Sequence, residues 1–198
     1  MSIKAGKRVI FTDSTGEVGY IEADRANSRL NINIGGTQVG SLRDAVQKIV
    51  PALHGKVGAT AGWVITAGTD KSLATLPASV TAGTLVIPIL GLDVGDIVTA
   101  VAAVGQVDSA GNNVTLVMSV RKITNDAASG HTDAQIGTDN VGTLTADTLL
   151  TDANENLKVS SLTETIAADE QLYVLLTGTT AGTTDIEISH LVVTVTKS

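Results

Sequence analysis

The chain has 198 residues, a net charge of −7, 43% hydrophobic residues and only 2% aromatic residues. Small-molecule pockets usually carry several aromatic side chains, so this composition argues against a ligand-binding enzyme. The chain has no cysteine, which excludes disulfides, thiolate metal sites and a cysteine nucleophile. The length allows one compact domain with an extension, or two small domains.

Charge is distributed unevenly along the chain. Residues 1–60 carry eight Lys and Arg against five Asp and Glu, whereas residues 61–198 carry five against fifteen. The simpler interpretation is a slightly basic N-terminal segment followed by a solvated acidic domain. The alternative is a basic arm that docks on an acidic surface. Acidity disfavours nucleic acid as a partner, because phosphate contacts need clustered Lys and Arg. We expect no membrane partner, since no run of 18 apolar residues occurs, and "MSIKAGKRVIF" lacks a signal-peptide core.

The front of the chain predicts a β-arm of short strands. "KRVIF", "YIEA" and "RLNINI" are separated by turn-forming residues. Such strands are too short and too thinly hydrophobic to be stable as an isolated hairpin. If "KRVIF" and "RLNINI" are edge strands, pairing with a neighbouring chain satisfies their backbone groups. The side chains that this pairing would bury together are Val9, Phe11, Leu30 and Ile32.

Ser41 begins a segment that predicts one short amphipathic helix. Ser41 and Asp44 resemble a capping box, and Pro51 should end the helix near Val50. A heptad-like stripe follows the cap, formed by Leu42, Val46, Ile49 and Leu53. Two interpretations stay open: the helix lies on the following β-domain, or three copies pack around a threefold axis.

The rest of the chain predicts an all-β, jelly-roll-like antiparallel β-sandwich over residues 57–198, behind an attachment and trimerisation segment over residues 1–56. The expected β-segments lie near 60–66, 83–90, 96–107, 113–123, 143–150, 156–162, 170–179 and 185–197. The polar, Gly-rich residues 124–142 are expected to form a long surface loop. In the last segment the apolar positions change parity, which predicts a bulge near Ser189–His190.

No motif indicates catalysis, a cofactor or a metal ion. The three histidines have no metal-ligand spacing, and "HTD" at 131–133 is explained by a solvated loop. There is no nucleophile elbow and no glycine-rich phosphate loop, while turn formation accounts for the many Asp residues. We therefore expect no catalytic, cofactor-binding or metal-binding residues and no enzymatic activity.

Two stretches carry a resemblance to a known class. "RLNINIGGTQVGSL" resembles arm-like N-terminal parts of bacteriophage virion proteins, and "DEQLYVLLTGTTAGTTDIEISHLVVTVTK" resembles jelly-roll domains of phage capsid decoration proteins and fibres. The resemblance covers residues 29–55 and 83–198 in general pattern. It implies a structural virion protein of the capsid decoration (cement) or head-fibre class. Such a protein would be made in the host cytoplasm, form a homotrimer and bind the major capsid protein on the head surface.

Two other functions stay open. A tail- or head-fibre module would adhere to host surface glycans, although the chain offers only Phe11, Tyr20, Trp63 and Tyr173 for sugar stacking. An ordinary cytosolic enzyme or ligand-binding β-domain has no motif in its support. For the virion role, the candidate interface residues are Val9, Phe11, Leu30, Ile32, Leu42, Val46, Ile49 and Leu53.

Overall fold

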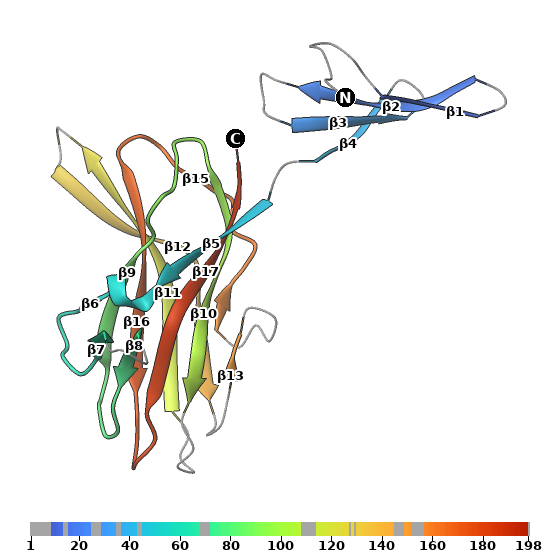
Figure 1. Ribbon diagram of the computed structural model, residues 1–198. Helices are drawn as coiled ribbons and strands as arrows, with labels where there is room; N and C mark the ends of the chain where they lie inside the picture. The colour runs from blue at the N-terminus through green and yellow to red at the C-terminus, as the bar shows by residue number, and fades with distance from the viewer. Residues whose placement is uncertain are drawn as a thin grey trace. The chain divides into compact units, whose positions relative to one another are not determined.

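The computed structural model describes residues 9–13, 16–24, 29–34, 37–42, 45–67, 72–107, 114–126, 128, 130–144, 149–151 and 157–197. Nearly all of its regular structure is β (Figure 1). The chain divides into two compact units, Met1–Val46 with Thr196–Ser198, and Gln47–Val195. The division thus falls after Val46, whereas the sequence was expected to change character at residue 56. Among the described residues, no helix is long and apolar enough to cross a membrane.

The N-terminal unit contains one antiparallel sheet in which each strand pairs with the next along the chain. Its strands are β1 (Val9–Asp13), β2 (Gly16–Asp24), β3 (Arg29–Ile34) and β4 (Thr37–Leu42). β1 lies at an edge of this sheet, as expected. The prediction that "RLNINI" is an edge strand is wrong, because β3 pairs with both β2 and β4.

The second unit, which we call the β-domain, holds two sheets that pack face to face around one core (Figure 1). The first sheet contains β5 (Ala45–Pro51), β7 (Val64–Ala67), β8 (Ser72–Leu76), β10 (Ile97–Val107), β13 (Leu149–Leu150), β14 (Lys158–Val159), β15 (Glu164–Thr165) and β17 (Ile186–Thr196). The second contains β6 (Lys56–Val57), β9 (Gly83–Pro88), β11 (Val114–Asp126), β12 (Gly130–Leu144) and β16 (Glu170–Thr179). A single 3-10 turn, η1 (Ala52–His54), follows β5.

The strand order confirms the predicted jelly roll. The first strand of the roll, β8, pairs with the last, β17, and the next, β9, pairs with β16. β10 pairs with the short segments β13, β14 and β15, and β11 pairs with β12. The chain therefore forms one long antiparallel ladder, which is rolled up so that successive pairs lie in opposite sheets.

Alternation of apolar and polar residues places the core as expected. Leu116 on β11 and Val174 on β16 are fully buried, and along β11 the inward positions alternate with more exposed ones up to Met118. In β17 the buried positions change parity between Ile188 and Leu191, which confirms the predicted shift of phase. Close to it, a Cβ atom on Gly105 of β10 would collide with the backbone of β17, so only glycine fits there.

The predicted helix after Ser41 is wrong. The residues of this segment that the structure describes form the end of β4 and β5, and β5 pairs with β17. Lys48 and Val50 are less exposed than Gln47 and Ile49, which is the alternation of a strand. A helix of about nine residues has little stability of its own in water, and β-branched residues fit a strand well. Pairing with β17 therefore decides the conformation.

The heptad-like stripe consequently does not exist as one face of a helix. Leu42 lies in β4, Val46 and Ile49 lie in β5, and Leu53 lies in η1. Ile49, expected in a buried seam, is 67% exposed in the single chain. A role for these residues in an interface stays a prediction.

The expected loop over residues 124–142 is also a strand pair. β11 continues to Asp126, and β12 runs back beside it from Gly130. The pairing is continuous from Asp126↔Gly130 to Val120↔Ile136, and it becomes irregular where Gly137 has a positive φ of 72°. The polar composition reflects exposure of the strand and not a lack of regular structure, since nearly all described side chains of residues 130–138 are exposed.

Leu116 provides a test of the core. We expect Leu116→Ala to lower the free energy of unfolding by about 2–5 kcal/mol, because it removes buried methyl groups and leaves a cavity. Thr115→Ala, at the neighbouring exposed position, should change it by about 0.5 kcal/mol or less. Urea unfolding of both variants measures the difference. Equal stabilities would show that the assigned strand phase is wrong.

Candidate interaction surfaces

The histidines do not form a common site. His54 ends η1 and is exposed, His131 is exposed on β12, and His190 lies on β17 with its Nδ1 2.9 Å from Ser189 Oγ. The part of the chain that the structure describes holds no group of three or more His, Asp or Glu side chains that could bind a metal ion. Asp133 of the "HTD" stretch instead belongs to a different polar cluster.

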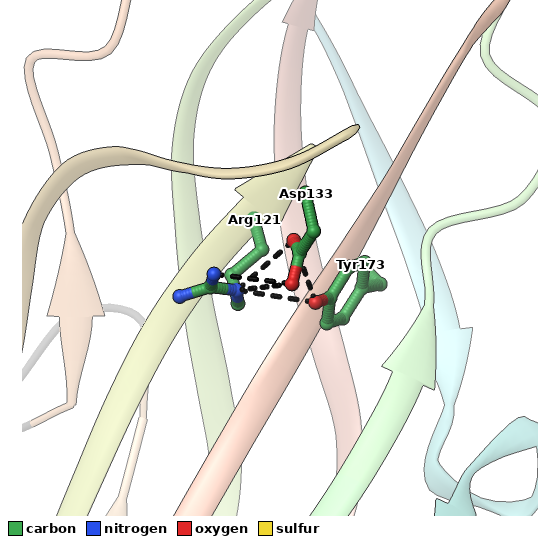
Figure 2. Close-up of polar contacts among 3 residues, drawn as sticks. All are labelled: Arg121, Asp133 and Tyr173. Carbon is green, nitrogen blue, oxygen red and sulfur yellow. Dashed lines mark hydrogen bonds and ion pairs between the residues drawn. The ribbon is translucent and has the colours of Figure 1, made fainter. Parts of the chain in front are cut away.

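Arg121, Asp133 and Tyr173 form this cluster, which we call the outer-face triad (Figure 2). They come from the three neighbouring strands β11, β12 and β16. Arg121 donates from Nε to Asp133 Oδ1 (3.1 Å) and from Nη2 to Oδ2 (3.1 Å). The Tyr173 hydroxyl donates to Asp133 Oδ1 at 2.9 Å. The triad therefore fastens the long β11–β12 hairpin to β16.

The electrostatics of the outer-face triad favour a structural role. Hydrogen bonding to Arg121 lowers the pKa of Asp133, and the same bonds raise the pKa of Arg121. Burial, followed by the hydrogen bond to Asp133, raises the pKa of Tyr173. All three groups thus keep their ordinary charge states at neutral pH, whereas a general base needs a pKa near the working pH.

A second cluster closes one end of the sandwich core. Along β11 the inward positions pass from Val120 to Lys122, whose Nζ lies 2.6 Å from Glu164 Oε1 and 2.7 Å from Glu170 Oε1. Glu164 belongs to β15 of the first sheet, while Lys122 and Glu170 belong to the second. This cross-sheet cluster links the two layers where the aliphatic core ends.

The charges of the cross-sheet cluster stabilise one another. Hydrogen bonds to Glu164 and then to Glu170 raise the pKa of Lys122, and the bond to Lys122 lowers the pKa of Glu170. Near the same end of the domain, Lys48 Nζ lies 3.6 Å from Oδ2 of the buried Asp96. Two basic side chains are therefore held by carboxylates near the start of β10.

The tip of the β11–β12 hairpin borders a shallow polar depression of about 460 Å³. Its lining residues are Asn125, Asp126, Gly130, His131 and Asp169. No aromatic side chain lines it. Trp63, which the sequence offered for sugar stacking, is only 3% exposed, and its Nε1 donates to the carbonyl of Gly83 at 3.0 Å. Trp63 therefore serves the core and is not a surface platform.

The N-terminal sheet brings together most of the predicted interface residues. Val9 and Phe11 lie on β1, Leu30 and Ile32 on β3, and Leu42 on β4. Val46, Ile49 and Leu53 follow on β5 and η1. β2, which contains the predicted strand "YIEA", pairs with both β1 and β3, but its residues Ile21 and Ala23 were not among the interface candidates.

Comparisons with known proteins give only distant structural similarity. No protein-family model and no curated protein matches the sequence. Among solved structures, the enzymatically active domain of tailspike protein 4 of bacteriophage CBA120 aligns at 9% identity and a TM-score of 0.36, over 75% of this chain and 19% of that one. A structure of infectious bursal disease virus (Gt strain) aligns at 10% identity and a TM-score of 0.25, over 94% of this chain and 45% of that one. The chain spans less than half the length of either.

Lys122 tests the cross-sheet cluster. We expect Lys122→Met to lower the free energy of unfolding by about 1–3 kcal/mol at neutral pH, because two carboxylates lose their cation. The lowered pKa of Glu170 stabilises the fold above the unfolded-state pKa of about 4.3, and this contribution is lost as the pH falls through the folded pKa. The difference from wild type should therefore shrink below about pH 4 in denaturant titrations. An equal loss in Lys56→Met, at an exposed lysine, would contradict a specific role.

Arg121→Ala should be nearly neutral for folding. Asp133 is 45% exposed, and ion pairs at such positions contribute about 1 kcal/mol or less. Thermal unfolding of the variant beside wild type checks this expectation. A loss well above about 2 kcal/mol would mean that the triad supports much more of the fold than its exposure implies.

Proposed function

We propose that the protein is a non-enzymatic structural component of a phage virion, a capsid decoration (cement) protein that binds the outer surface of the head. The observation that carries the proposal is that one chain contains two unlike units, a small single-layer sheet and a jelly roll with its own core. The jelly roll has its own closed core, so it forms a stable outward body. The N-terminal sheet is left for attachment.

The edges of the N-terminal sheet offer a means of attachment. β1 and β4 are its outermost strands, and no described strand pairs with the outer side of either. Edge strands present backbone N–H and C=O groups that can pair with a strand of another protein. In this proposal the partner is the major capsid protein, whose neighbouring subunits the protein would clamp together.

Charge contributes little to this attachment. Residues 1–46 carry six Lys and Arg against five Asp and Glu, so the unit is almost neutral. Long-range attraction is screened within about 8 Å at physiological salt. Binding then depends on shape, on backbone hydrogen bonds and on several arms acting together, because the second and third contacts of one assembly are effectively intramolecular.

The polar clusters support a structural rather than a catalytic role. The outer-face triad and the cross-sheet cluster are engaged in hydrogen bonds among themselves. The pKa values of Asp133 and Glu170 are lowered and that of Lys122 is raised, all away from neutral pH. A head- or tail-fibre module that adheres to host glycans is the second candidate. The polar depression at the hairpin tip favours it, while the burial of Trp63 weakens it.

Head binding tests the proposal. Purified full-length protein is mixed with heads that lack it, and co-sedimentation is measured. We expect binding that weakens only modestly at about 1 M salt, since the Coulomb contribution is small. Deletion of residues 1–46 should abolish binding and leave a folded β-domain, as judged by its circular dichroism.

Two outcomes would contradict this account. If the truncated protein still binds heads, the attachment surface lies on the β-domain and not on the N-terminal sheet. Failure of the intact protein to bind heads, together with selective binding to a glycan array that His131→Ala removes, would favour the fibre alternative.

A further inference from the structure

The outermost strands of the β-domain differ in length and in their protection against pairing with another chain. β6, β13, β14 and β15 have two residues each, and β7 has four. β5 is longer, but it contains Lys48 and ends at Pro51, and natural proteins use lysine and proline on edge strands to prevent such pairing. β12 has fifteen residues and contains neither residue type. Among the described strands of the β-domain, it is the long edge with the least protection.

Only the first part of β12 is open on its outer side. At Gly137 the strand meets the other sheet closely, because a Cβ atom there would collide with the side chain of Leu162. Residues 130–136 pair with β11 on one side, and no described strand pairs with their other side. We call these seven residues the open edge. They belong to the yellow hairpin at the upper left of the β-domain in Figure 1, and the side chains from 130 to 135 are all exposed.

Two hydrogen bonds show in which direction the backbone groups of the hairpin point. The N–H of Asn125 donates to the carbonyl of Asp169 at 2.9 Å, so the backbone groups of Asn125 point away from β12. The carbonyl of Leu172 accepts from the N–H of Ile89 at 2.9 Å and therefore points away from β11. Lys122 lies opposite Leu172, so its own backbone groups bond to β12. Both observations give the same alternation along β11.

This alternation assigns the backbone groups of the open edge. His131 lies opposite Asn125, so the two residues form a pair without mutual hydrogen bonds and the backbone groups of His131 point outward. The direction alternates from residue to residue along a strand. The N–H and C=O groups of His131, Asp133 and Gln135 therefore all point out of the sheet, and they offer a further strand a row of alternating donors and acceptors.

The polar side chains of the open edge fit a second copy of the same edge. Identical edges that make equivalent contacts pair antiparallel about a twofold axis. With Thr132 on the axis, His131 of each copy lies opposite Asp133 of the other, and an imidazole can donate a hydrogen bond to a carboxylate. With Asp133 on the axis, two carboxylates would lie opposite one another, which is unfavourable. With Ala134 on the axis, Asp133 would face only the neutral Gln135. Charge therefore favours the first register.

Asp133 can make this contact without leaving the outer-face triad. Its carboxylate accepts from Nε and Nη2 of Arg121 and from the hydroxyl of Tyr173. An ionised carboxylate has about four acceptor positions, and the side chain of Asp133 is 45% exposed. The triad thus neutralises the carboxylate and leaves it able to accept from a second chain.

We propose that the open edge of β12 pairs with the open edge of a second copy of this chain, with the two Thr132 residues facing one another on a twofold axis. The second sheets of two β-domains then join into one continuous antiparallel sheet. This inference goes beyond the proposed function, because it gives the β-domain a contact of its own, separate from head attachment by the N-terminal sheet. Pairing is measured without heads, so its failure and a failure of head binding are distinguishable.

Thr132→Cys and Ala134→Cys form a matched test. Both positions are exposed and lie on the same face of the same strand, and the chain has no cysteine of its own. In the proposed register the two Cα atoms at position 132 lie about 4.5 Å apart, within reach of a disulfide, whereas those at position 134 lie about 14 Å apart. On mild oxidation, we expect two-chain bands on a non-reducing gel for Thr132→Cys and single chains for Ala134→Cys.

Solution mass provides the second measurement. Thr132→Lys would place two lysines opposite one another on the axis, where like charges oppose pairing. In sedimentation over a dilution series, this variant should have half the average mass of the wild type at the highest concentration. Thr115→Lys, which adds the same charge at an exposed position of β11, should keep the wild-type mass. Circular dichroism checks that both variants are folded.

Three results would overturn the proposal. The first is cross-linking of Ala134→Cys that equals or exceeds that of Thr132→Cys, and the second is an absence of cross-linking in both. The third is an equal mass for the wild type and Thr132→Lys at every concentration. If that equal mass is accompanied by a loss of head binding in Thr132→Lys, the open edge pairs with a strand of the capsid and not with a second copy.

Discussion

The structure depends on one antiparallel ladder whose inward side chains are almost entirely aliphatic. The first strands of the roll pair with strands from the end of the chain, as β8 does with β17 and β9 with β16. Two sheets about 10 Å apart need inward side chains that interdigitate closely. With a single Trp in the core, the fit relies on small residues: a Cβ on Gly178 would collide with Leu76, and one on Gly105 would collide with β17.

The same alternation sets the limit of the core. Past Val120 and Leu172 the next inward positions are Lys122 and Glu170. Lys122 forms ion pairs with Glu170 and with Glu164 of the other sheet. Because a slip of one residue exchanges the two faces of a strand, such a slip in β11 would separate Lys122 from both carboxylates and expose the aliphatic positions. The cross-sheet cluster therefore reinforces the register that the apolar residues set.

In the proposed role, the two units of the chain have different functions. The β-domain packs its two sheets around one core, and the outer-face triad links its long hairpin to β16. The N-terminal sheet has two outer strands, β1 and β4, and no described strand pairs with the outer side of either. In the proposed function, these edges bind the shell and the β-domain faces outward.

The sequence by itself determined the features that depend on local alternation. It predicted the all-β jelly roll, the inward positions of β11 and β16, and the change of parity between Ile188 and Leu191. These features can be read from the sequence because a strand with one buried face has an apolar residue at every second position. It also named Val9, Phe11, Leu30, Ile32 and Leu42 as candidate interface residues. They lie on β1, β3 and β4 of one sheet, and their role in an interface stays a prediction.

Only the tertiary structure decided the segments whose local signals are weak or divided. Leu42, Val46, Ile49 and Leu53 fit a helical spacing, but β5 forms because β17 offers a ladder of backbone hydrogen bonds, which a marginal helix of about nine residues cannot match. The polar hairpin over residues 124–142 has no apolar alternation to reveal it. It forms by pairing with β11, and Asp133 contacts Arg121 on β11 and Tyr173 on β16. The contact with Tyr173 joins residues 40 positions apart in the chain, which no local pattern reveals.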